Sequence, residues 1–123
     1  MRWKSDYHNL LIWQKGKEFV LLVYKKTENF PKSEIFGLQS QIRRAAVSFL
    51  LNIVEGQRRN FYQKEFLRFL EMSDSSLVEV EACLEIAFEL KYLSLEDYKE
   101  LEERRRELAV MLASLMKTIE KSL

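Results

Sequence analysis

Four amphipathic segments follow one another along the sequence. In each of them apolar residues recur every three and four positions, the spacing that places side chains on one face of an α-helix. The breaks between them are short and polar, and one break contains Pro31, the only proline. No segment alternates as a strand does, so we expect helices over residues 10–27, 34–55, 61–90 and 94–122.

Residues near three helix ends refine this prediction. We expect Gly56 to close the second helix in the left-handed conformation, and Asn60 to cap the third. Ser94 is expected to cap the fourth helix, because Asp97 follows three positions later in a near match to a capping box.

Composition agrees with a single all-α domain. The chain has 123 residues, of which 47% are hydrophobic and 32% charged, with only three glycines. Four helices with short connections pack most simply as an up-and-down antiparallel four-helix bundle. The apolar runs are far shorter than the roughly 18 residues of a membrane span, and the amino terminus lacks the apolar stretch of a signal peptide. We therefore expect a soluble cytoplasmic protein with no membrane partner.

The net charge of +1 conceals two halves of opposite sign. Residues 1–64 contain 12 basic and 5 acidic residues, whereas residues 65–123 contain 8 and 14. This division can serve an anionic partner of the first half, or attraction between the halves within the bundle or between subunits. The near-neutral total favours the internal explanation, because phosphate backbones are bound by an excess of positive charge.

The second helix is apolar on two sides. Besides its main stripe it has a second group of apolar residues, centred about 130° away on a helical projection. These residues either widen the bundle core or form a subunit interface. Monomers rarely expose large apolar patches, so we favour a homo-oligomer formed through the second and third helices. The predicted interface residues are Val47, Leu50, Leu51 and Val54.

Several short motifs occur in a characteristic order: LIWQK from Leu11, FGL from Phe36, QIRRAAVS from Gln41 and NIVEG from Asn52. Together they resemble the 23S ribosomal RNA intervening-sequence proteins over nearly the whole chain. The resemblance implies a four-helix bundle that assembles as a ring-like homopentamer. A more distant similarity to the accessory variability proteins of diversity-generating retroelements implies RNA, DNA or a nucleic-acid-processing protein as partner. One departure from the family pattern is Lys91, which replaces a glycine and makes a left-handed helix end more costly.

Basic residues of the second helix, the following loop and the start of the third helix are the candidate nucleic-acid site. Guanidinium groups can donate paired hydrogen bonds to phosphate oxygens, and unstacked bases can stack on the rings of Phe61 and Tyr62. The alternative is that the arginines pair with carboxylates of the bundle, with Glu55 as one expected partner of Arg44, Arg58 or Arg59. The candidate residues are Arg43, Arg44, Arg58, Arg59, Lys64 and Arg68.

No motif indicates catalysis, a cofactor or a metal. His8 is the only histidine and Cys83 the only cysteine, and Glu-x-x-His pairs and glycine-rich phosphate loops are absent from the sequence. We therefore expect a non-enzymatic, oligomeric assembly or accessory protein with a basic surface for RNA or DNA. The alternative function is a structural or protein-binding scaffold whose charges serve subunit contacts, and salt-dependent RNA binding separates the two.

Overall fold

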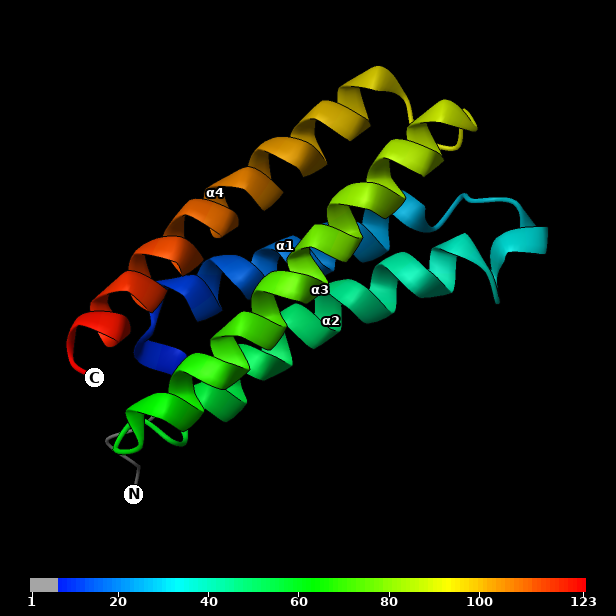
Figure 1. The fold of residues 1–123 in the computed structure, drawn as a ribbon. Coiled ribbons are helices and arrows are strands. Elements are labelled where there is room, and N and C mark those ends of the chain that lie inside the picture. Colours follow the sequence, from blue (N-terminus) through cyan, green and yellow to red (C-terminus); the bar gives the residue numbers. More distant parts are fainter. Residues whose placement is uncertain (1–6) are drawn as a thin grey trace.

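Four α-helices joined by short turns make up nearly all of the computed structural model, which describes residues 7–123 (Figure 1). Within that range there is no strand, and single turns of 3-10 helix precede α1 and α2. No helix in it combines the length and apolar character that crossing a membrane requires. The elements are η1 (Tyr7–Asn9), α1 (Leu11–Thr27), η2 (Lys32–Glu34), α2 (Leu38–Gln57), α3 (Gln63–Glu89) and α4 (Leu95–Lys121).

Each helix packs against two others, in the order α1, α2, α3, α4 and back to α1, and the contact between α2 and α3 is the most extensive. The all-α, up-and-down antiparallel four-helix bundle is thus confirmed. The α2–α3 turn and the end of α4 lie at the same end of the bundle, where the Ser122 hydroxyl donates to Gln63 Oε1 at 2.8 Å (Figure 1).

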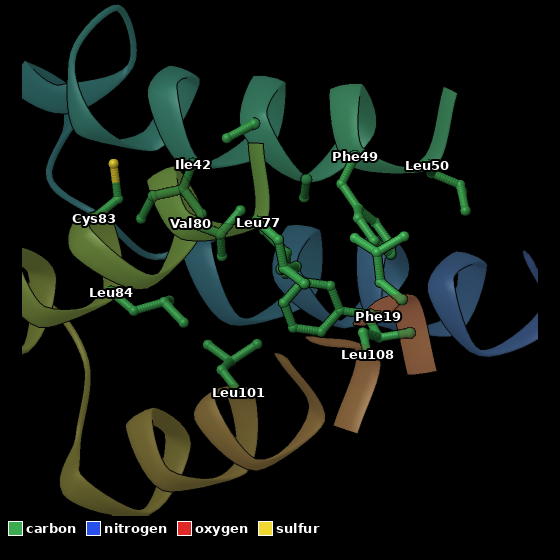
Figure 2. Close-up of a cluster of buried hydrophobic side chains, with 14 of the residues drawn as sticks. Phe19, Ile42, Phe49, Leu50, Leu77, Val80, Cys83, Leu84, Leu101 and Leu108 are labelled. Atoms are coloured by element: carbon green, nitrogen blue, oxygen red, sulfur yellow. The ribbon is translucent and has the colours of Figure 1, made fainter. Parts of the chain in front are cut away.

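The core is built from all four helices (Figure 2). Buried residues recur at intervals of seven in α2, α3 and α4, because seven residues are close to two helical turns and keep the side chains on the inner face. The fully buried members at this spacing are Ile42 and Phe49 of α2, Leu70, Leu77 and Leu84 of α3, and Leu101 and Leu108 of α4.

Gly56 lies inside α2, so the prediction that it closes the helix in the left-handed conformation is wrong. Its function is close packing. A Cβ atom at this position would lie 2.9 Å from Cδ1 of Phe66, so the hydrogen of glycine admits the ring of α3.

Two predicted helix starts also differ from the structure. The α-helix α2 begins at Leu38, because residues before it form η2 and the Glu34 carboxylate accepts a hydrogen bond from the Leu38 amide at 2.8 Å. α3 begins at Gln63 with no side-chain cap, and Asn60 Oδ1 is buried without a hydrogen-bond partner in the described part of the chain. Asn60 is therefore not the cap of α3.

The predicted cap of α4 is confirmed. The Ser94 hydroxyl accepts a hydrogen bond from the Asp97 amide at 3.0 Å. This bond satisfies one of the amides that the first turn of a helix leaves without a partner.

Lys91 is the one residue of the described chain, glycine excepted, with a positive φ, at 64°. The Lys91 amide donates to the Phe88 carbonyl and the Tyr92 amide to the Ala87 carbonyl, both at 2.9 Å. These two bonds define a Schellman motif, which ends α3 with a residue in the left-handed conformation. Lysine therefore occupies the position that the motif usually gives to glycine.

Replacing Lys91 with glycine is expected to raise the free energy of unfolding by about 1 kcal/mol, because glycine adopts this conformation without the Cβ strain. Urea unfolding followed by circular dichroism measures the change. Lys91→Ala is the matched control and should show no such gain, because it removes the charge but keeps Cβ. A Lys91→Gly variant less stable than Lys91→Ala would contradict this explanation.

Cys83 packs in the core as a small apolar residue. Burial raises the pKa of its thiol, and the charge of Glu79 raises it further. We expect iodoacetamide at pH 8 to alkylate the folded chain at least about tenfold more slowly than the urea-unfolded chain, since only an exposed thiolate reacts. Equal rates for the two forms would show that the thiol is accessible in the native bundle.

Candidate functional site

The six predicted nucleic-acid residues do not form one patch. Arg43 and Arg44 belong to the first half of α2, whereas Arg58 and Arg59 follow its end. Fifteen residues of helix span about 22 Å at 1.5 Å per residue, which separates the two pairs. The structure gathers Arg58, Arg59, Lys64 and Arg68 around the α2–α3 turn.

Arg43 is engaged in a contact between helices. Its Nε donates to Thr27 Oγ1 at 2.9 Å, and its Nη2 donates to the Tyr24 carbonyl at 3.0 Å. The guanidinium also lies over the Tyr24 ring, 4.5 Å from its centre. Arg43 therefore fastens α2 to the last turn of α1.

Arg59 and Arg68 both lie over the Phe69 ring, and each is paired with a carboxylate. Their guanidinium carbons lie 4.5 and 4.9 Å from the centre of the Phe69 ring. Arg59 Nη1 is 2.8 Å from Glu55 Oε1, and Arg68 Nη2 is 3.0 Å from Glu65 Oε1. The expected cationic partner of Glu55 is thus Arg59.

Arg58 and Lys64 have the most available charge at this turn. Arg58 is mostly exposed, and its one ion pair is a long contact of 3.8 Å to Glu55, a carboxylate that Arg59 holds at 2.8 Å. Lys64 is exposed and has no ion pair in the described chain. Beside them Phe61 is 88% and Tyr62 is 70% exposed. We name Arg58, Phe61, Tyr62 and Lys64 the turn surface. Two cations beside two open aromatic faces match what phosphates and unpaired bases require.

The Glu65 carboxyl should reveal its pairing through its pKa, which the hydrogen bond and then the charge of Arg68 lower. Because the folded-state pKa is depressed, the pair stabilises the protein above the unfolded pKa of Glu65, and this contribution is lost as the pH falls through the folded pKa. In a carbon-detected NMR titration, Arg68→Gln should move the Glu65 midpoint upward. Lys64→Gln, one residue away, is the control and should leave the midpoint nearly unchanged. An unmoved midpoint in Arg68→Gln would contradict the pairing.

A second feature is the solvent-facing side of α2, which holds an open groove of about 370 Å³. Leu51 is 55% exposed at the groove, whereas Val47 and Val54 are half-buried. Arg44 is exposed and has no hydrogen bond or ion pair within residues 7–123. We name the groove the α2 groove; its lining residues are Tyr24, Arg44, Val47, Ser48, Leu51 and Asn52.

Leu50 differs from the expectation that it lies on the surface, because it is buried in the core of its own chain. The reason is Gly16 of α1. A Cβ atom at Gly16 would lie 2.7 Å from Leu50 Cδ1, so the absence of a side chain there lets Leu50 fill the space between α1 and α2.

Hydrogen bonds join α2 and α3 beside this groove, and the sequence pattern did not reveal them. The hydroxyls of Ser48 and Ser76 are 2.9 Å apart, and Gln41 donates to Glu79. The buried Ser73 hydroxyl donates to the Phe49 carbonyl at 2.7 Å. The serines within the helical stripes were the available sequence signal for these bonds, since small side chains permit α2 and α3 to approach closely.

Ion pairs between the two halves of the chain support the internal explanation of the charge division. Lys26 of α1 is 2.9 Å from Asp97 and 3.4 Å from Glu100 of α4, and Lys15 is 3.3 Å from Glu107. The hydrogen bond to Asp97 raises the pKa of Lys26. Part of the opposite charge thus serves packing of α1 against α4.

No group of three or more histidine, cysteine or acidic side chains within residues 7–123 is arranged to hold a metal ion. The turn surface combines two cations with two aromatic rings, and the α2 groove combines Arg44 with polar and apolar side chains.

Comparison with known proteins identifies the family of this chain. The family model described as 23S rRNA-intervening sequence protein matches residues 8–114. The chain belongs to this family. The turn surface and the α2 groove are therefore surfaces of a four-helix bundle of the 23S rRNA-intervening sequence family.

Several solved chains match this one, and one of them is similar over nearly its whole length. It is the crystal structure of a protein with unknown function from the S23 ribosomal protein family of Bacteroides thetaiotaomicron VPI-5482. The two share 24% sequence identity and a TM-score of 0.78, over 87% of this chain and 99% of the other. A search of curated proteins finds no match.

Proposed function

We propose that this protein is a non-enzymatic accessory protein that binds unpaired nucleic acid through the turn surface and self-associates through the α2 groove. The observation that carries the proposal is the exposure of Phe61 and Tyr62 beside Arg58 and Lys64. Two large aromatic rings in water are unfavourable unless a partner covers them. Bases of single strands stack on such rings, and the adjacent cations contact the phosphates.

The charge of the turn supports weak binding per copy. Between residues 55 and 68 there are four basic and two acidic residues, and the acidic ones are held by Arg59 and Arg68. Phosphate contacts by two cations, Arg58 and Lys64, would give a slope of log affinity against log salt of about −1.4 for a single strand. Self-association would multiply the contacts, because several turn surfaces on one particle bind one strand with avidity.

The test is fluorescence anisotropy with labelled single-stranded RNA, single-stranded DNA and duplex at several salt concentrations. The family name makes RNA the first ligand to test. We expect single strands to bind more tightly than duplex. Replacing both Phe61 and Tyr62 with serine should weaken single-strand binding at least about tenfold, since stacking contributes about 1–3 kcal/mol per base.

A charge-matched pair of variants locates the site. Arg58→Glu with Lys64→Glu changes the net charge as much as Lys99→Glu with Arg104→Glu, which alters exposed residues of α4 far from the turn. The first pair should abolish salt-dependent binding and the second should preserve most of it. Equal losses in both would show an effect of overall charge, and no binding by the unaltered protein would refute the nucleic-acid proposal.

The second candidate function is a scaffold whose charges serve only protein contacts. The pairing of Arg43, Arg59 and Arg68 within the chain favours it. It predicts a self-associated particle that binds no nucleic acid at any salt concentration, and the same anisotropy series decides between the two functions.

A further inference from the structure

The α2 groove is lined by one cation, Arg44, together with apolar and polar side chains. Arg44 is exposed without a hydrogen bond or ion pair in the described chain, while Leu51 and Val47 line the same open groove. A partner surface that matches it must supply apolar side chains together with a free carboxylate, because an arginine covered without a counter-charge is strongly unfavourable.

A second α2 does not supply that carboxylate. Between Leu38 and Gln57 the only acidic residue is Glu55, and Arg58 and Arg59 already engage it. Two copies that met groove to groove would cover both Arg44 side chains, and neither α2 would supply a free carboxylate. Glu79 of α3 lines a neighbouring pocket with Arg44, but it accepts from Gln41 and forms no ion pair with Arg44. The complementary surface therefore lies elsewhere on the molecule.

The outward side of α3 has the required chemistry. Its exposed residues recur every three or four positions, so they share one face of the helix. Val78 is 53% exposed near the middle of this face, and its glutamates have no ion pair within residues 7–123. We name it the α3 face; its residues are Glu71, Ser75, Val78, Ala82, Glu85 and Glu89.

The helices that border the two surfaces have opposite charge. α1, which contributes Tyr24 to the α2 groove, has four lysines and one glutamate, and its Lys15 and Lys26 are already paired with α4. α3 has two basic and seven acidic residues. This complementarity favours an approach of α3 toward the α1–α2 side of another copy and disfavours an approach of α3 toward α3.

We infer that the occupant of the α2 groove is the α3 face of a second copy of this chain, with Arg44 opposite the acidic residues around Val78. The inference rests on the self-association proposed above and specifies its partner surface. Because the two surfaces differ, each copy keeps one free surface of each kind, and association continues until a ring closes.

Two variants, each blocked at one surface, test this arrangement. The groove-blocked chain is Arg44→Glu with Leu51→Glu, and the face-blocked chain is Val78→Lys with Glu85→Lys. All four side chains are exposed, so circular dichroism should show unchanged helix content. We expect each variant alone to have the mass of a single chain by light scattering. Mixed in equal amounts, they should associate again, because the intact groove of one variant meets the intact face of the other.

The control is Val110→Glu on the exposed side of α4, which should keep the mass of the unaltered particle. The inference is overturned if the unaltered protein self-associates but the face-blocked chain does too, or if the mixture contains only single chains. Dissociation of the Val110→Glu control would also overturn it, by placing the contact on α4. If the unaltered protein is a single chain at all concentrations, the proposed self-association itself fails.

Discussion

Replacing Phe49 with alanine is expected to lower the free energy of unfolding by about 3–5 kcal/mol, the largest effect of any single substitution considered for this bundle. Phe49 has no exposed surface. Its ring lies close to Gly16 of α1, where a Cβ atom would be 3.2 Å from Cε2, and its carbonyl accepts the Ser73 hydroxyl of α3. Truncation removes the ring that lies between α2 and α1 and leaves a cavity that the neighbouring helices fill only in part.

Urea unfolding at a fixed protein concentration measures this loss, since self-association would couple stability to concentration. Phe36→Ala is the matched control. Phe36 is 97% exposed, so its loss should change the free energy of unfolding by no more than about 0.5 kcal/mol. A loss below about 1 kcal/mol for Phe49→Ala would mean that the core is not packed around this ring.

Replacing Arg105 with alanine is expected to cost about 3 kcal/mol, because the nearly buried Glu102 carboxylate loses its main partner and keeps only the exposed Arg106, at 3.4 Å. Arg105 Nε and Nη2 donate to the two oxygens of Glu102 at 2.9 and 2.6 Å, and Nη2 is 3.4 Å from Glu81 of α3. The hydrogen bonds to Glu102 outweigh burial and raise the pKa of Arg105. The arginine therefore stays charged and joins α4 to α3.

The informative control replaces both partners. Arg105→Met combined with Glu102→Leu removes the ion pair and its desolvation together, so the double variant should lie within about 1 kcal/mol of the unaltered protein. Thermal unfolding of the single and double variants provides the comparison. A double variant as unstable as Arg105→Ala would show that the ion pair itself contributes the lost stability, and that the unpaired carboxylate is not the cause.

The helices and their inner faces could be predicted from the sequence because burial imposes a strict spacing. Ile42, Phe49, Leu101 and Leu108 lie inside as their spacing requires. Arg105 shows the limit of that pattern. It lies four residues after Leu101, within the apolar stripe, and position on the stripe outweighed its charge because Glu102 supplies a partner.

Contacts between helices could not be predicted with the same certainty. Leu50 is buried because Gly16 of another helix leaves room for it, and Gly56 faces Phe66 from within α2. Both depend on which helices touch at which residue, which periodicity does not specify.

The separation of the six candidate basic residues into two groups was partly predictable. The length of α2 alone separates Arg43 from Arg58 by more than any side chain can bridge. Which arginines pair with carboxylates depends on side-chain conformations, as the stacking of Arg59 and Arg68 on Phe69 illustrates. The site that remains is smaller than the predicted patch and combines two cations with two exposed rings.

Ultraviolet cross-linking of the unaltered protein to single-stranded RNA, followed by mass spectrometry of tryptic peptides, tests the turn surface most directly. Cleavage after Arg59 and Lys64 releases one peptide, residues 60–64, that contains both Phe61 and Tyr62. We predict that this peptide carries the cross-linked nucleotide and that the cross-link fades as salt is raised. Cross-links confined to peptides of α1 or α4, or none at low salt, would contradict the proposed function.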